Sequence, residues 1–332
     1  MGAGDRAQRG TAEGDQGPRP TMAGASLPPA ADPLRLEGLL RDLAVRLTPP
    51  HRRLMLLIVG LGILAWAIDG LIPAGATVAR IEPAGPPPPG VVSPSGLVLL
   101  GVPAGVFTVG CTLGQGETCP SDEGPAHPVR LSRALWMSQE PVSRALVETL
   151  LGRPASGERR GRCAAPTCPA HVALEDALRV ANALSIAEGL EPCFSVGAAT
   201  AEWPEGPACR GYRLPTEAEW EIAARGGEDL STPGGAPLGR PDPGTPNGYG
   251  LLGLGFGVGE WVWGEDHAYD DGEQLDPTGV GPWGRTAVIW LGMRSRPVRG
   301  ASPDDGGPAR VSDRAVEARA EPHPFRLVRS LP

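Results

Sequence analysis

Six cysteines are the residues of this chain with the strongest chemistry of their own, and all of them follow residue 110. They occur as three pairs of near neighbours, namely Cys111 with Cys119, Cys163 with Cys168, and Cys193 with Cys209. Thiols at such short separations either form disulfides or bind a metal. The spacing from Cys163 to Cys168 is a poor one for zinc, and no second CxxC pair follows it. Disulfides between neighbours are therefore expected, although six cysteines can pair in about 15 ways.

Other groups that could do acid–base or nucleophilic chemistry are scattered along the chain. The chain has five histidines, His51, His127, His171, His267 and His323. No two of them have the helical or turn spacing that would bring them to one metal ion. Ser302 has no Gly-x-Ser-x-Gly elbow around it, and no third member of a triad with His323 is visible. Residue spacing alone therefore indicates no catalytic constellation.

The clearest local element is a capped helix within GYRLPTEAEWEIAARGG, residues 211–227. The hydroxyl of Thr216 can accept the backbone N–H of Glu219, and the Glu219 side chain can reach back to the N–H of Thr216, which together make a capping box. Gly226 and Gly227 then end the helix. This pattern predicts a helix over Thr216–Arg225.

Two further helices are expected over Pro141–Leu151 and Leu174–Glu188, and short apolar runs predict strands at Leu97–Leu100, Val106–Val109 and Ala287–Leu291. Glycine (48) and proline (39) are both abundant, so loops should be many and regular elements few. Few helices, short strands and loops joined by cysteines are typical of an irregular α+β domain.

An apolar segment precedes this domain. The run from Leu54 to Ile68 carries no charge, and with Leu71 and Ile72 it approaches the roughly 20 residues that span a bilayer. Basic residues before the run place the N-terminus in the cytoplasm by the positive-inside rule. The A-x-A pattern at 74–76 leaves a cleaved signal sequence as the alternative, with secretion as its outcome. Either interpretation exports the rest of the chain, to the periplasm or the exterior of a bacterial cell.

The predicted organisation has five parts. A disordered tail covers 1–33, a short amphipathic juxtamembrane helix 34–53, a transmembrane helix or signal anchor 54–76, a Pro-rich linker 77–95, and a folded domain 96–332. Residues 1–53 hold 8 Arg against 6 Asp and Glu, so residues 54–332 hold 22 (30 − 8) against 32 (38 − 6), a net charge of −10. An acidic main body argues against a nucleic-acid partner.

The motifs of the folded domain resemble, in order, those of the formylglycine-generating-enzyme (sulfatase-modifying factor) family. They are GVFTVG at 105–110, DEGPAHPV at 122–129, EPVS at 140–143, VALEDALRVANAL at 172–184, the stretch 211–227, NGYGL at 247–251, DPTG at 276–279, VRG at 298–300 and FRLVR at 325–329. This resemblance implies a C-type-lectin-like fold. It also implies an activity, the oxidation of a target cysteine to formylglycine by a copper(I)-binding cysteine pair, since soft thiolates suit Cu(I).

The resemblance breaks down at the residues that carry this activity. The family's cysteines lie three and eight residues beyond a serine that matches Ser302, and these positions hold Asp305 and Arg310. The last cysteine of the chain is Cys209, so no other alignment restores the pair. Copper is therefore not expected as a cofactor.

A second family site is also reduced. The family's asparagine and glutamate that help to hold calcium match Gly257 and Glu260, so the resemblance implies at most a weakened calcium site at Glu260. No other cofactor is indicated.

The resemblance without the cysteines predicts a binding or scaffolding domain at the cell envelope, a pseudoenzyme whose partner is a protein, peptide or glycan. The alternative is a family enzyme, of oxidoreductase or sulfatase-modifying type, that uses another site. The residues that would form it are Arg299, Ser302, Asp305, Arg310 and Arg314.

Overall fold

The computed structural model describes residues 81–112, 120–155, 163, 165–198, 200–227, 244–254, 259–264, 268–279, 287–290, 295–300, 311–318 and 321–332. All of them belong to the compact unit Ala74–Pro332. The segments predicted as tail, juxtamembrane helix and membrane span lie outside the described residues, as do Cys119, Ser302, Asp305 and Arg310. No helix within the described ranges combines the length and the apolar character needed to cross a bilayer.

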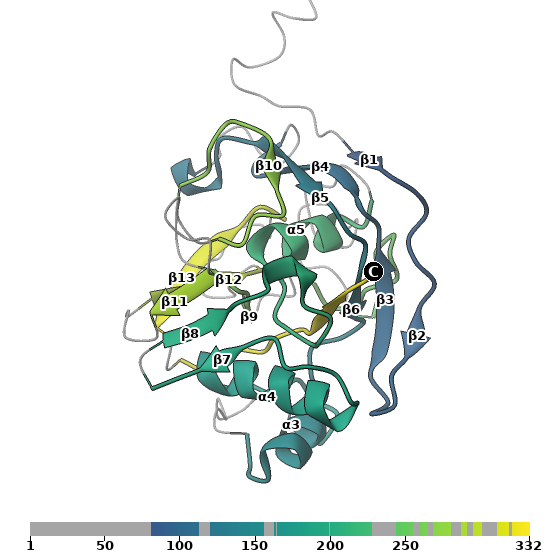
Figure 1. Cartoon of the computed structure of the whole chain (residues 1–332). Helices are drawn as coiled ribbons and strands as arrows, with labels where there is room; N and C mark the ends of the chain where they lie inside the picture. The colour runs from purple at the N-terminus through teal and green to yellow at the C-terminus, as the bar shows by residue number, and fades with distance from the viewer. Residues whose placement is uncertain are drawn as a thin grey trace, which may run out of the picture. The chain divides into compact units, whose positions relative to one another are not determined.

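Four small sheets are present in the part of the domain that the structure describes (Figure 1). The first has the order β1 (Ile81–Pro83), β4 (Gly105–Val109), β5 (His127–Leu131) and β10 (Gln274–Leu275). The second has the order β14 (Val328–Ser330), β6 (Leu135–Ser138), β3 (Val98–Val102) and β2 (Val91–Val92). The other two are β11 (Ala287–Trp290), β8 (Thr200–Trp203), β7 (Ser195–Val196), and β13 (Arg314–Ala318), β12 (Ser295–Arg299), β9 (Glu260–Trp261). Of the pairings in these sheets, only β5 with β10 is parallel.

Three α-helices accompany the sheets in the described part of the chain: α3 (Arg144–Leu151), α4 (Leu174–Ala187) and α5 (Glu217–Arg225), with two 3-10 turns at Ser121–Glu123 and Gly206–Ala208. The three predicted helices are confirmed, with α3 beginning at Arg144 because Ser143 caps it. The capping box of α5 is present in both directions. In Figure 1, α3 and α4 lie together beside β7, whereas α5 lies at the centre of the domain.

The apolar core has two clusters. One surrounds α4 and includes Trp203, Trp261 and Trp263, and the other surrounds β4, β5 and α5. All nine residues of α5 are buried, although the helix contains three glutamates and an arginine. A charged helix in this position must find partners for its charges, since an unpaired buried charge is strongly unfavourable.

The stretch predicted as a Pro-rich linker is partly folded, which corrects the predicted boundary at residue 96. Strand β1 pairs with β4, and β2 pairs with β3. Both are edge strands, where proline is tolerated because one side of the strand needs no N–H donor. Glycines allow the close approach: a Cβ at Gly101 would overlap the carbonyl oxygen of Pro88, and one at Gly105 that of Glu82.

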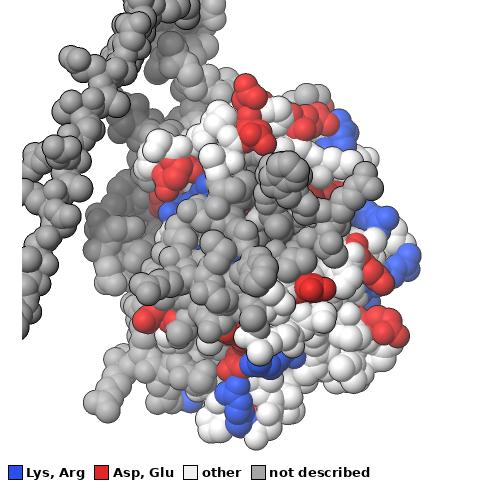
Figure 2. All heavy atoms as spheres, turned by 60° about the vertical axis from the view of Figure 1, so that its left-hand side comes forward, with Lys and Arg blue, Asp and Glu red and all other residues white. Residues whose placement is uncertain are grey.

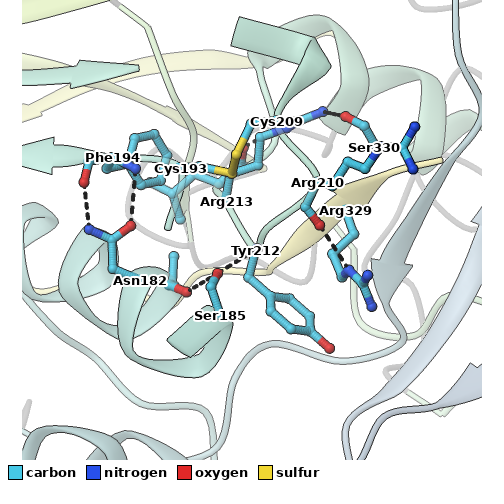
Figure 3. Close-up of a disulfide and its surroundings, with 12 residues drawn as sticks. Asn182, Ser185, Cys193, Phe194, Cys209, Arg210, Tyr212, Arg213, Arg329 and Ser330 are labelled. Atoms are coloured by element: carbon cyan, nitrogen blue, oxygen red, sulfur yellow. Dashed lines mark hydrogen bonds between the residues drawn. A yellow bond between two sulfur atoms is a disulfide. The ribbon is translucent and has the colours of Figure 1, made fainter. Parts of the chain in front are cut away.

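Two of the predicted disulfides are observed, Cys163–Cys168 and Cys193–Cys209. Cys111 is also disulfide-bonded, and its expected partner, Cys119, lies outside the described residues. Cys193 and Cys209 are both buried, and their bond joins the segment after α4 to the segment before Tyr212 (Figure 3).

Candidate functional site

The three glutamates of α5 position the candidate site. Residues four apart lie on one helical face, so Glu217 and Glu221 point to the same side and Glu219 points away from them. The structure follows this geometry. Glu217 and Glu221 bind arginines of the β12–β13 hairpin, and Glu219 binds Arg213 on the other side of the helix.

Glu221 is the most buried of the three, with no exposed side-chain surface. Its Oε1 accepts hydrogen bonds from Arg225 Nη2 at 2.7 Å and from the backbone N–H of Gly110 at 2.8 Å, and its Oε2 accepts one from Arg299 Nη2. One carboxylate thereby joins α5, the end of β4 and β12. Two arginines around a single carboxylate leave the local charge positive by one unit, before other neighbours are considered.

Arg299 and Arg314 face each other across the β12–β13 hairpin. Arg299 donates to the Tyr269 hydroxyl at 3.3 Å and to the Val311 carbonyl at 3.1 Å. Arg314 forms two hydrogen bonds with Glu217, from Nε at 3.0 Å and from Nη2 at 2.9 Å, and its guanidinium lies 4.5 Å from the centre of the Tyr269 ring. The base of the hairpin is therefore held to α5 by two ion pairs.

Charge and burial act together on Tyr269. Burial raises the pKa of its hydroxyl, and the carboxylates of Glu217 and Glu221 raise it further, against the opposing effect of the two hairpin arginines. The phenol consequently stays protonated throughout the physiological range. It can accept the hydrogen bond from Arg299 as a neutral group, and it is not suited to act as a base.

A small open pocket lies beside Glu217, where β4, β5 and the segment around β10 meet α5. It is lined by Val109, His127, Glu217, Ala218, Tyr269, Gln274, Pro277 and Gly279. The ring of His127 lies 4.6 Å from that of Tyr269, and its Nδ1 lies 3.0 Å from the Pro125 carbonyl. Imidazole, phenol and paired carboxylate can together offer hydrogen bonds to a polar group of a ligand.

Glu260, the residue predicted for a weakened calcium site, has other partners. Its carboxylate accepts hydrogen bonds from Arg326 Nε at 3.0 and 3.1 Å and from Trp220 Nε1 at 2.8 Å. A cation would have to compete with a buried guanidinium for the same oxygens. Among the described residues, no group of three or more His, Cys, Asp or Glu side chains gathers as a metal site would require. This donor set does not fit calcium.

The residues present do not fit copper either. The five described cysteines are disulfide-bonded, so none of them offers a thiolate. The two positions that match the family's cysteines hold a carboxylate and a guanidinium in the sequence. Neither group is a soft ligand for Cu(I).

The structure thus brings together two of the five residues predicted for an alternative site, Arg299 and Arg314. The other three, Ser302, Asp305 and Arg310, lie outside the described residues. Sequence reasoning did not identify Glu217, Glu221 and Tyr269 as their partners. The available signal was the i, i+4 spacing of two glutamates in a helix whose other residues are mostly apolar.

Figure 2 shows one face of the domain, turned from the view of Figure 1. Acidic and basic side chains alternate in small groups there, with no large area of one sign among the described atoms.

Comparisons with known proteins agree with this architecture. Residues 91–242 match the model of the family described as sulfatase-modifying factor enzyme 1-like domain. Treponema denticola variable protein 1 is similar in structure, with a TM-score of 0.55, 23% sequence identity and coverage of 77% of this chain and 100% of its own. PvdO from Pseudomonas aeruginosa has a TM-score of 0.53 and 20% identity, with coverage of 75% of this chain and 100% of its own.

At these identities the two structures indicate a shared fold only, and no curated protein matches the sequence. The family match ends at residue 242, before the β12–β13 hairpin. Over residues 91–242 the chain is therefore similar to sulfatase-modifying factor enzyme 1-like domains.

Proposed function

We propose that this protein is a non-catalytic member of the family, exported and anchored in the bacterial inner membrane, whose domain binds or scaffolds a partner at the cell envelope. One observation carries the proposal. The chain has no cysteine after Cys209, so the thiol pair on which the family's chemistry depends is missing while the domain is retained.

The contacts of the hairpin arginines support a structural use of this region. Arg299 is fully buried and bonded to Glu221, Tyr269 and Val311, and Arg314 is bonded to Glu217. Guanidinium groups held in this way stabilise the base of the hairpin. They are not free to change partners during a reaction without uncovering a buried carboxylate.

Export is supported by two independent features of the chain. The apolar run that begins at Leu54 follows basic residues, as in a segment with a cytoplasmic N-terminus. The domain also contains disulfides, which persist in oxidising compartments and are rare in the cytosol.

The experiment uses the full-length protein, tagged at its N-terminus, as bait in a solubilised envelope extract. We expect one protein partner to be captured in near-stoichiometric amount. The matched control is Glu221→Gln, which removes the carboxylate shared by Arg225 and Arg299 and should reduce capture through loss of the domain's structure. Capture that is equal from wild type and from a denatured bait would contradict specific binding.

A second candidate function, catalysis at a different site, is favoured by one observation. Arg299 and Arg314 lie side by side at the base of a hairpin whose intervening sequence contains Ser302, Asp305 and Arg310. Incubation of the full-length protein with Cu(I), oxygen and a cysteine-containing sulfatase peptide tests the family reaction. Aldehyde formation on the peptide would reject the non-catalytic proposal, and we expect none.

A further inference from the structure

The two disulfides whose cysteines are both described differ in their exposure to solvent. Cys193 and Cys209 are both buried, at 3% and 2% exposure, so an external thiol cannot reach their bond in the folded domain (Figure 3). In the other disulfide Cys168 is also buried, at 4%, but Cys163 is exposed. Among the five cysteines that the structure describes, Cys163 alone is exposed.

This exposure has a chemical consequence, because thiol–disulfide exchange begins when a thiolate reaches one sulfur of the bond. A buried bond can be attacked only in the small fraction of molecules whose structure has opened locally. Residues 165–167, which lie in the turn between the two cysteines, are exposed as well. We therefore expect Cys163–Cys168 to react with an external thiol well before Cys193–Cys209.

The loop that this bond closes also caps α3. The first N–H groups of an α-helix have no acceptor within the helix, so other groups must supply one. The N–H of Arg144 donates to the carbonyl of Cys168 at 2.9 Å. The N–H of Ala145 donates to the carbonyl of Pro166, also at 2.9 Å. The hydroxyl of Ser143 accepts the next N–H at 3.3 Å, so two of these three caps depend on the conformation of the disulfide loop.

Helix α3 is short enough to depend on these caps. It has 8 residues, fewer than the roughly 12–15 that an isolated helix needs to be stable in water. It packs on the core through the buried Val147 and through three half-buried leucines, which are Leu146, Leu150 and Leu151. Loss of two caps should therefore loosen the first turn of α3, while the packing of its later residues on the core remains.

We propose that Cys163–Cys168 is a site of reversible thiol–disulfide exchange with a dithiol, and that reduction of this bond releases the N-terminal cap of α3. The proposal goes beyond the binding function and does not depend on it. A dithiol is the fitting partner because its second thiol resolves the mixed disulfide. The sequence separation of 5 keeps the two cysteines close to each other after reduction, which makes the exchange reversible.

The exchange has two steps. A thiolate of the dithiol attacks the exposed Cys163, and a bond forms between the two sulfurs while the bond to Cys168 breaks. Cys168 leaves as a thiolate and takes a proton from solvent. The second thiolate of the partner then attacks the partner's own sulfur in the mixed disulfide, and Cys163 leaves and is protonated in turn. Two electrons and two protons have passed from the dithiol to the protein, and the partner has become a disulfide.

The test treats the oxidised full-length protein with dithiothreitol under native conditions and stops the reaction at successive times with excess N-ethylmaleimide. The protein is then unfolded and fully reduced, and the remaining cysteines are alkylated with iodoacetamide. Peptide mass spectrometry gives the reduced fraction of each pair. We expect Cys163 and Cys168 to be reduced at least about tenfold faster than Cys193 and Cys209, which are the control within the same molecule.

Hydrogen exchange on the selectively reduced protein tests the release of the cap. The N–H groups of Arg144 and Ala145 should exchange about fivefold faster or more, the usual effect of losing a helix cap. The amides of residues 178–184 in α4 should keep their rates. Oxidised dithiothreitol should restore both the bond and the slow exchange. The double variant Cys163→Ser, Cys168→Ser should show the faster exchange without any dithiol.

Two results would overturn the proposal. One is an equal rate of reduction for the two pairs, and the other is unchanged exchange at Arg144 and Ala145 after selective reduction of Cys163–Cys168. Both measurements use wild-type protein, so neither depends on whether the double variant folds. Neither involves an envelope partner, so failure to capture one would reject the scaffolding role and leave the exchange site in place.

Discussion

The surroundings of α4 and of α5 hold distant segments together by different chemistry. Asn182, Ser185 and Glu188 of the α4 region use neutral or singly charged contacts. Asn182 exchanges two hydrogen bonds with the backbone of Phe194, and Ser185 accepts from the N–H of Tyr212 (Figure 3). Glu188 accepts a hydrogen bond from the Tyr212 hydroxyl. The Cys193–Cys209 disulfide closes the same region. Around α5, ion pairs between buried glutamates and arginines hold the segments together instead.

The difference in chemistry between the α4 and α5 regions goes with the sequence separation of the residues that each region joins. The contacts of Asn182 with Phe194 and of Ser185 with Tyr212 join residues 12 and 27 apart, which a short disulfide loop and local hydrogen bonds can hold. Glu217 and Glu221 reach arginines 97 and 78 residues away. Neutral contacts resist wrong pairings weakly, whereas a buried charge without its partner is strongly penalised. We therefore expect the α5 network to favour the native pairing of these distant segments over other pairings.

The largest expected effect comes from Glu221→Gln. This change leaves Arg299 and Arg225 buried beside a neutral amide, and loss of one partner of a buried ion pair costs about 3–5 kcal/mol. Urea unfolding of the full-length protein, followed by tryptophan fluorescence, should show this loss.

The matched control for that variant is Glu148→Gln on α3. Its carboxylate lies 3.7 Å from Arg144 and is 40% exposed, so its removal should change the free energy of unfolding by less than about 1 kcal/mol. Equal losses of unfolding free energy in the two variants would contradict a larger contribution of the buried ion pair at Glu221 than of the exposed one at Glu148.

The second largest expected loss of stability comes from removal of the disulfide that closes the α4 region. Replacement of both Cys193 and Cys209 by serine opens a loop with a sequence separation of 16, for which the chain-entropy estimate is about 3 kcal/mol. The same change at Cys163 and Cys168, with a separation of 5, should cost about 2 kcal/mol. Thermal unfolding of the two double variants, each compared with wild type, measures the difference. A larger loss at Cys163 and Cys168 would reverse the ranking.

The parts of the fold and of the candidate site that the sequence predicts are those formed by residues close together along the chain. The helices and the capping box at Thr216 were predictable because caps and helical periodicity are properties of adjacent residues. Neighbour pairing of Cys163 with Cys168 and Cys193 with Cys209 was predictable for the same reason.

Long-range partners were not predictable. Nothing in the residues around Glu217 indicates Arg314 as its partner, because the pairing exists only once β13 lies beside β12 and α5. The sequence predicts a linker over β1 and β2 because the two strands are short, stand in a proline-rich stretch and give no periodic signal. Their pairing partners, β4 and β3, supply the order that their own sequences lack.

The smallest expected effect separates neutral from charged contacts within the α4 region. Tyr212→Phe removes the hydrogen bond to Glu188, a loss of about 0.5–1.5 kcal/mol at neutral pH. Burial alone would raise the pKa of Glu188, but hydrogen bonds from Tyr212, Ser93 and Ser95 lower it below its ordinary value of 4.5. A lowered carboxyl pKa adds stability above pH 4.5, and this stability is lost as the pH falls through the folded-state pKa.

Protonation of Glu188 should therefore make wild type behave like the variant. The difference in unfolding free energy between wild type and Tyr212→Phe, measured by urea titration from pH 7 down to pH 3, should narrow as Glu188 becomes protonated. The reason is that a neutral carboxyl group is a weaker acceptor for the Tyr212 hydroxyl than the carboxylate. A difference that stays constant over this range would mean that the Tyr212 hydroxyl gains nothing from the charge of Glu188 and that Tyr212 contributes by packing alone.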